Sequence, residues 1–276
     1  MEAPIWSITQ LISDSLMVLA VGLATPLIKH TKNIYHRGFF CNDEDIMHPL
    51  KSPSFVESRW FHFVGVLINI VVIVFVEYFL YKKYYERITF WRFKLSMWIY
   101  NTYSVLLSFA FGVLICILIT TVLKGSIGRL RPSFINACIP NINCSLLENH
   151  HVYHINYECT NKNFEINNRL SFPSGHSSFS MFCGIFLAIY VQKRIIWNIS
   201  KLFKSCIQFA LMLIVLYVGG SRVSDFKHHW SDVLAGYLIG GLCAVLVCIN
   251  LYGNFHGLPL SQHKPKNCVS PDLNLK

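Results

Sequence analysis

Three short groups of charged, hydroxyl and imidazole residues stand out because each lies next to a long apolar stretch. They occupy residues 124–132, 171–177 and 221–232. Lys124, Arg131 and Arg222 supply three fixed positive charges. Guanidinium groups match phosphate oxygens in pairs, and a lysine adds a compact charge. Together the three groups predict a binding site for a phosphate ester.

The second group could bind an anion through the backbone as well as through side chains. Ser174 and Gly175 directly precede an apolar stretch, so Ser174 is predicted to be the N-cap of a helix. The N–H groups of a first helical turn point at any anion placed there. We therefore expect this turn to contribute to phosphate binding.

The histidines could supply the reactive groups for phosphate transfer. His228 and Asp232 are four residues apart and share one face if that stretch is helical. A carboxylate bonded to one ring nitrogen fixes the tautomer and leaves the other nitrogen free to attack phosphorus. His176 would protonate the leaving alkoxide and then activate water, giving a two-step reaction through a phosphohistidine. His229 is three residues from Asp232, so spacing alone leaves it open as the nucleophile.

A metal site is the main chemical alternative, because three histidines lie close together at His150, His151 and His154. They lack partner cysteines or carboxylates at the spacing of metal ligands. Metal-dependent phosphoryl transfer would need clustered acids, and the three groups offer chiefly Asp225 and Asp232. We therefore expect neither a metal nor another cofactor.

The elements that must position these groups are membrane helices. Only 14% of the residues are charged and the mean hydropathy is +0.43, against about 25% charged residues in a soluble domain. A bilayer crossing takes roughly 20 apolar residues. The predicted spans are residues 6–28, 61–80, 97–123, 174–192, 206–220 and 233–252, with a cytosolic tail at 253–276. The sequence thus predicts an all-α, polytopic membrane protein, a bundle of six transmembrane helices in a single domain over residues 1–276.

The orientation follows from basic residues in two short loops. Residues 81–96 contain five lysines and arginines against one glutamate, and residues 193–205 contain four and no acid. Short basic loops face the cytosol, so both termini are predicted to be cytosolic. The three chemical groups then meet on the extracellular or luminal face. The net charge of +10 suits anionic lipid surfaces. Many of the aromatic residues lie in the spans, and we expect no nucleic-acid partner.

Cysteine placement agrees with this orientation. Cys41, Cys138, Cys144 and Cys159 fall in non-cytosolic loops, where an oxidising compartment allows two disulfides with three alternative connectivities. The sequon at Asn143 lies in the same loops and is a candidate for glycosylation. A second sequon, at residues 198–200, is predicted to be cytosolic and unmodified.

The three groups resemble the signature of the lipid phosphate phosphatases, within the type 2 phosphatidic acid phosphatase superfamily. That signature is a Lys, six residues and Arg-Pro; then Pro-Ser-Gly-His; then Ser-Arg, five residues, His, three residues and Asp. The matching residues are Lys124, Arg131-Pro132, Pro173 to His176, Ser221-Arg222, His228 and Asp232. The resemblance extends over roughly residues 14–252.

The resemblance implies a role for each matching residue. Phosphate would be bound by Lys124, Arg131, Ser174, Gly175 and Arg222. His176 would be the general acid, His228 the nucleophile and Asp232 the residue that orients it. It also implies a metal-independent enzyme with a six-helix fold. The substrates implied by the resemblance are phosphatidate, lysophosphatidate, ceramide 1-phosphate and sphingosine 1-phosphate.

Two other functions stay open at this point. One is a luminal phosphatase for a soluble phosphate ester, as in the glucose-6-phosphatase branch of the superfamily. The other is a non-catalytic membrane protein that binds lipid phosphates, although the complete set of histidines favours activity. The membrane would be the plasma membrane or an ER or Golgi membrane, and the sequence neither requires nor excludes a homo-oligomer.

Overall fold

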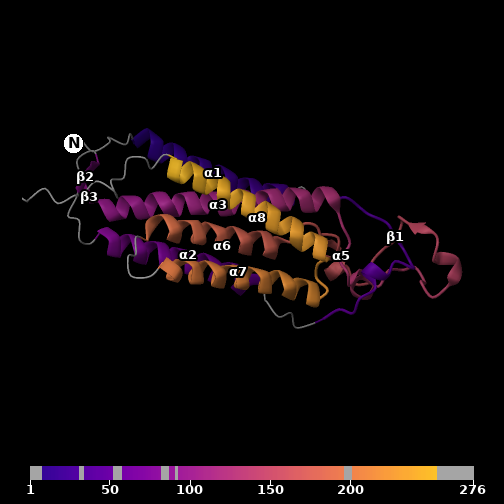
Figure 1. Ribbon diagram of the computed structural model, residues 1–276. Helices are drawn as coiled ribbons and strands as arrows, with labels where there is room; N and C mark the ends of the chain where they lie inside the picture. The colour runs from indigo at the N-terminus through magenta and orange to yellow at the C-terminus, as the bar shows by residue number, and fades with distance from the viewer. Residues whose placement is uncertain are drawn as a thin grey trace, which may run out of the picture.

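The computed structural model describes residues 8–30, 34–51, 58–81, 87–90, 93–195 and 201–253. Within these ranges, six helices have 20 or more residues. They are α1 (Ile8–His30), α2 (Ser58–Tyr81), α3 (Met97–Ile127), α6 (Gly175–Arg194), α7 (Lys201–Ser224) and α8 (Trp230–Gly253). They run alongside one another as one elongated bundle (Figure 1). Each predicted span falls largely on one of these helices. The largest differences are in α7, which extends beyond both ends of its predicted span.

Four of these helices contain a segment long and apolar enough to cross a membrane. The segments are Trp60–Phe79, Trp98–Ile127, Leu202–Ser224 and Trp230–Asn250. Helix α1 carries a shorter apolar stretch, Ile12–Ile28. Helix α6 begins with a polar turn and packs against α2, α3, α7 and α8, with most of its length buried. A helix enclosed by protein needs less apolar surface than one that faces lipid.

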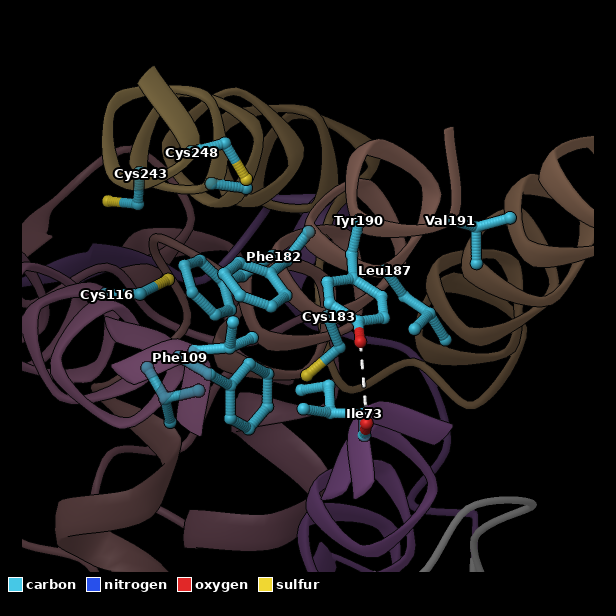
Figure 2. Packing of buried hydrophobic residues seen from close by; sticks show 14 of the residues in the cluster. Ile73, Phe109, Cys116, Phe182, Cys183, Leu187, Tyr190, Val191, Cys243 and Cys248 are labelled. Atoms are coloured by element: carbon cyan, nitrogen blue, oxygen red, sulfur yellow. Dashed lines mark hydrogen bonds between the residues drawn. The ribbon is translucent and has the colours of Figure 1, made fainter. Parts of the chain in front are cut away.

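The core of the bundle is aromatic and centres on α6. Phe182, Phe186 and Tyr190 of α6 are fully buried, and Phe109 of α3 packs edge-on against Phe186 with ring centroids 5.2 Å apart. Figure 2 shows the rings of Phe109, Phe182 and Tyr190 together with Ile73 of α2. The carbonyl of Ile73 accepts a hydrogen bond from the Tyr190 hydroxyl. This core fixes α2, α3 and α6 relative to one another.

Helix α8 lies unusually close to α6. A Cβ atom added to Gly240 would come 2.1 Å from the carbonyl oxygen of Ser178, so no larger side chain fits there without a shift. Small residues at such contacts allow helix backbones to approach in lipid. The approach brings the start of α8, which carries Asp232, next to the start of α6, which carries His176.

A buried ionic cluster joins α2 to α6 near the end of the bundle opposite the predicted site. Both nitrogens Nε and Nη2 of Arg194 donate to the carboxylate of Glu77, at 2.8 and 2.5 Å. The Tyr190 hydroxyl donates to the same carboxylate at 2.9 Å. The sequence interpretation counted Arg194 among the charges of a cytosolic loop. Instead it lies in the last turn of α6, with its charge compensated inside the bundle.

The remaining elements are short and include strands that the all-α prediction lacked. Strands β2 (Arg87–Phe90) and β3 (Phe93–Ser96) form a hairpin at one end of the bundle (Figure 1). At the other end, residues 34–51 and 128–174 form what we call the cap. It contains β1 (Phe39–Phe40) paired with β4 (Tyr153–His154), the 3-10 helices Glu44–Ile46 and Leu147–Asn149, and the helices α4 (Phe134–Cys138) and α5 (Lys162–Asn168).

Two disulfides hold the cap together. Cys41 pairs with Cys144, and Cys138 pairs with Cys159, which selects one of the three connectivities left open by the sequence. Their four cysteines lie in or against a small core that includes Phe39, Phe134 and Tyr157.

The sequon at residues 198–200 and the tail from residue 254 lie outside the described residues.

Candidate active site

The first group of residues begins in the last turn of α3 and continues into the cap. The Nζ atom of Lys124 donates to the carbonyl of Leu170 at 2.7 Å. Backbone hydrogen bonds from Arg131 to Asn168 and from Ser171 to Arg129 join residues 129–131 to residues 168–171. These bonds place the first two groups side by side.

The start of α6 brings the second group to the same place. Ser174 is the N-cap of α6, as predicted, and its hydroxyl oxygen accepts hydrogen bonds from the N–H and hydroxyl of Ser177. Its own N–H donates to the backbone carbonyl of Asp232 at 2.9 Å, which ties α6 to α8. A Cβ atom on Gly175 would lie 3.8 Å from Cε of Lys124, so the lysine side chain passes beside this helix start.

The third group forms the turn between α7 and α8. Arg222 is 3% exposed, and its Nη2 donates to Oδ2 of Asp225 at 3.1 Å. The other oxygen of Asp225 faces Nζ of Lys51 in the cap at 3.6 Å. The ring of Phe226 stacks on His48 with centroids 4.5 Å apart. The cap segment around residues 48–51 thus covers this turn.

The orientation of His228 differs from the prediction. Its Nδ1 lies 2.7 Å from the carbonyl oxygen of Ser171 but 3.8 Å from Oδ2 of Asp232, which is too long for a hydrogen bond. Since a carbonyl can only accept, Nδ1 carries the proton and Nε2 of a neutral ring has a free lone pair. The expected hydrogen bond between His228 and Asp232 was therefore wrong. As expected, however, one ring nitrogen is fixed by a hydrogen bond and the other can attack phosphorus.

Burial keeps the His228 ring neutral. The side chain is almost completely enclosed, and this desolvation lowers the pKa of His228 to about 3. The nearby carboxylate of Asp232 acts in the opposite direction, while Lys124 and Arg131 lower the pKa further. A neutral imidazole is the nucleophilic form, so the ring is in its reactive state at neutral pH.

Asp232 has a different set of partners from the one predicted. Its carboxylate accepts from the Ser171 hydroxyl at 2.6 Å and from Nη1 of Arg129 at 2.7 Å. It also accepts from the backbone N–H of His229 at 3.0 Å, and its Oδ2 lies 3.2 Å from Nδ1 of the same residue. The bond to the backbone is one half of a capping box, in which the third residue of a helix bonds back to its N-cap.

Sequence reasoning gave Ser171 and Arg129 no role, yet both determine how the histidine turn is held. Ser171 contacts His228 through its carbonyl and Asp232 through its hydroxyl. Arg129 binds the carboxylate of Asp232 and the hydroxyl of Ser231. The one available signal was position: Arg129 is two residues from Arg131, and alternate residues of an extended segment share a face.

The basic residues converge on the histidines. Burial, followed by the charge of Arg222, lowers the pKa of Arg131 to about 10 against the opposing effect of Asp232. The Nε atom of Arg131 is buried and has no hydrogen-bond partner among the described residues. His176 lies within electrostatic reach of Arg222, His228 and Lys124. The predicted phosphate-binding and catalytic residues are thus gathered at one end of the bundle.

One further cation lies near the site, and two of the three histidines considered as metal ligands have partners within the cap. Burial and the charge of Arg131 lower the pKa of Lys227, an additional basic residue that the sequence interpretation passed over. In the cap, His150 and His154 each contact a backbone carbonyl at 3.0 Å. Within the described ranges, no three His, Cys, Asp or Glu side chains are grouped so that they could hold a metal ion.

Comparison with known sequences identifies the family of this chain. The sequence profile of the PAP2 superfamily matches residues 105–255, more than half of the chain, and the protein belongs to that superfamily. Human phospholipid phosphatase 2 is 35% identical over 263 residues, which cover 94% of this chain and 86% of the human protein. Rat phospholipid phosphatase 1 is 36% identical over 240 residues, with coverage of 86% and 82%.

Of two further relatives, one is matched over less of its own length and the other is less similar in sequence. A Drosophila melanogaster protein, provisionally named a phosphatidate phosphatase, is 38% identical over 251 residues, and the match spans 85% of this chain but 66% of the fly protein. The crystal structure of a transmembrane PAP2-type phosphatidylglycerolphosphate phosphatase from Bacillus subtilis is 21% identical. The match covers 86% of this chain and 93% of the bacterial chain, with a TM-score of 0.39.

Proposed function

We propose that this protein hydrolyses lipid phosphate monoesters at the extracellular or luminal face of a membrane, through a phosphohistidine on His228. The observation that carries the proposal is the state of His228. The ring is buried and neutral, Nδ1 is fixed by the Ser171 carbonyl, and Lys124 and Arg131 are close enough to influence it. A nucleophile with one fixed nitrogen beside fixed cations suits attack on a phosphate.

Binding of the phosphate would use the basic residues and the start of α6. Lys124, Arg131 and Arg222 neutralise the phosphate oxygens, and the buried Nε of Arg131 is one donor for them. Ser174 and Gly175 present the first turn of α6, where backbone N–H groups favour an anion. Preorganised donors of this kind also stabilise the extra negative charge that the oxygens acquire in the transition state.

The reaction would proceed in two displacements. In the first, Nε2 of His228 forms a bond to phosphorus while the bond to the alcohol oxygen breaks. His176, protonated in the complex because the phosphate dianion lies beside it, gives its proton to that oxygen. In the second, His176 removes a proton from water, the hydroxide attacks phosphorus and the phosphorus–nitrogen bond breaks. The products are the alcohol and inorganic phosphate, and both histidines return to their starting states. No step requires a metal ion.

The placement of the site at the end of apolar helices supports a lipid substrate. A lipid can present its phosphate there while its chains stay in the bilayer. The relatives named as phospholipid and phosphatidate phosphatases support the same class. Phosphatidate, lysophosphatidate, ceramide 1-phosphate and sphingosine 1-phosphate are the proposed substrates.

The proposed topology has six membrane crossings, including α1 and the enclosed α6, with both termini in the cytosol. Two features support it. The two disulfides of the cap suit an oxidising compartment, and the cap lies at the same end as the candidate site. The hairpin β2–β3, in the basic loop predicted to be cytosolic, lies at the opposite end (Figure 1).

The test is a phosphate-release assay on the purified full chain in mixed detergent–lipid micelles with EDTA present. Release from lysophosphatidate is expected, and release from glucose 6-phosphate instead would assign the protein to soluble esters. The wild-type protein should carry radioactive phosphate on histidine when it is quenched during turnover of labelled lysophosphatidate. Binding of the lipid with neither turnover nor labelled protein would indicate a non-catalytic binding protein and overturn the proposal.

A further inference from the structure

Two aromatic residues at the start of α2 lie directly against His176, although neither belongs to the three chemical groups. The ring of Phe61 stacks on His176 with centroids 5.2 Å apart and planes 27° apart. The imidazole of His62 lies 5.4 Å from His176, tilted by 54°. The imidazole of His176 therefore has a wall formed by Phe61 and His62 of a different helix.

This contact is built into the packing of α2 on α6. A Cβ atom added to Gly65 would come 2.6 Å from the ring of Phe179, so α2 approaches α6 closely at this level. Gly65 follows His62 by three residues, as Phe179 follows His176 by three, so the two helices meet in register. His62 itself packs on Phe179 with ring centroids 4.7 Å apart and is half-buried. Its position is thus set by packing.

The position of the wall determines which part of a substrate it would touch. In the reaction proposed above, the phosphate is held by cations of α3, the cap and α7, and His176 contacts the oxygen that leaves. The atoms that follow this oxygen belong to the alcohol. Because Phe61 and His62 pack against His176, the first carbons of the alcohol would lie beside them.

We propose that His62 is a specificity-determining residue that recognises a polar group on the second carbon from the leaving oxygen. Its imidazole can donate a hydrogen bond to a hydroxyl or an ester oxygen there. Phe61 offers an apolar surface to the neighbouring carbons. The substrate class would be glycerol-based lipid phosphates, in preference to simple alkyl phosphates. This inference rests on the proposed function, and no bond is made or broken at His62.

The test compares two lipid phosphates with equal chains in mixed micelles. Palmitoyl lysophosphatidate has a hydroxyl on the second carbon from the leaving oxygen, whereas hexadecyl phosphate has none. The variants are His62→Leu, which removes the hydrogen bond, and His62→Gln, which keeps a donor and an acceptor. Trp60→Leu is the matched control, because Trp60 lies in the same helical turn but is 66% exposed.

We expect His62→Leu to lower kcat/KM for lysophosphatidate about tenfold while that for hexadecyl phosphate changes by about twofold or less. His62→Gln should keep the wild-type ratio of the two values, and Trp60→Leu should leave both unchanged. An equal loss on both substrates would mean that His62 acts only through structure, and no loss on either would mean that it does not contact the substrate. Both results would overturn the inference. Activity that survives in His228→Ala would instead overturn the proposed function.

Discussion

The carbonyl oxygen of Ser171 lies 2.7 Å from Nδ1 of His228 and fixes the ring that the sequence expected Asp232 to orient. The hydroxyl of the same serine donates to Asp232 at 2.6 Å. Ser171 thus connects the candidate nucleophile to the buried carboxylate four residues further along the chain. The carboxylate acts on His228 through its charge and through the turn that it stabilises.

Replacing Ser171 by alanine should separate these two contacts. Ser171→Ala keeps the backbone carbonyl and removes the hydrogen bond to a charged, buried group, which contributes roughly 1.5–3 kcal/mol. If the bond acts in the transition state, kcat should fall about tenfold to a hundredfold while KM changes little. Steady-state kinetics on lysophosphatidate would measure this. Unchanged kcat would show that the carbonyl alone positions the ring.

The two neighbouring histidines should differ sharply when replaced. His228→Ala removes the proposed nucleophile and should lower kcat by about four orders of magnitude or more. His229→Ala removes a contact with Asp232 but leaves the backbone bond at 3.0 Å in place, so we expect a loss of about tenfold or less. Both variants would be compared by phosphate release and by labelling of the protein. A larger loss in His229→Ala would assign the nucleophile to His229.

Arg129 should affect kcat through the planar geometry of its guanidinium group as well as through its charge. Its Nη1 contacts Oδ1 of Asp232 and the hydroxyl of Ser231, each at 2.7 Å. Arg129→Lys keeps the charge but cannot reproduce the planar fork, so kcat should fall about tenfold to a hundredfold, as for other residues that orient catalytic groups. Arg129→Met should lose more. Equal activity of Arg129→Lys and wild type would show that only the charge at this position is needed.

The sequence predicted the helices well because apolar stretches of bilayer length leave few alternatives. It also predicted the start of α6, since Ser174 is an N-cap directly before an apolar run. It predicted the orientation of His228 incorrectly because spacing by four places side chains together only within a helix. Helix α8 begins at Trp230, so His228 precedes it and Asp232 caps it instead.

Three other features depended on tertiary contacts that no local pattern encodes. The partners of Asp232 are Ser171 and Arg129, which are 61 and 103 residues away in the chain. Arg194 looked like a loop charge because its partner Glu77 lies 117 residues earlier. The polar start of α6 is tolerated because four other helices enclose this helix. Each of these features depends on where the residues lie in the bundle, which cannot be read directly from the sequence.

The stability of the protein should depend on pH through His228. Its pKa is about 3 in the folded state, against 6.5 for an ordinary histidine. Below about pH 6.5 the unfolded chain binds a proton that the folded protein does not accept until about pH 3. This residue therefore has no effect on stability above that window, and the free energy of unfolding falls as the pH drops through it, by at most about 1.4 kcal/mol per pH unit.

The His228→Asn variant lacks this titration and should lose less stability on acidification. Denaturant unfolding in detergent at about pH 7.5 and about pH 5 would measure both proteins, and the other histidines contribute equally to each. The same loss in both proteins would mean that the His228 ring is solvated and protonates normally.

Removing only one charge of the buried Glu77–Arg194 pair should strongly reduce the stability of the protein. Both residues are almost fully enclosed, with exposed fractions of 0% and 3%. Glu77→Gln leaves a buried, uncompensated guanidinium, which we expect to reduce the free energy of unfolding by about 3–5 kcal/mol. The double variant Glu77→Leu, Arg194→Met removes both charges and should cost much less, since apolar residues of similar volume often replace such pairs without loss. Denaturant unfolding of the two variants in detergent tests this directly. A loss below about 1 kcal/mol in Glu77→Gln would be typical of an exposed pair, and would show that Arg194 reaches water at the end of α6.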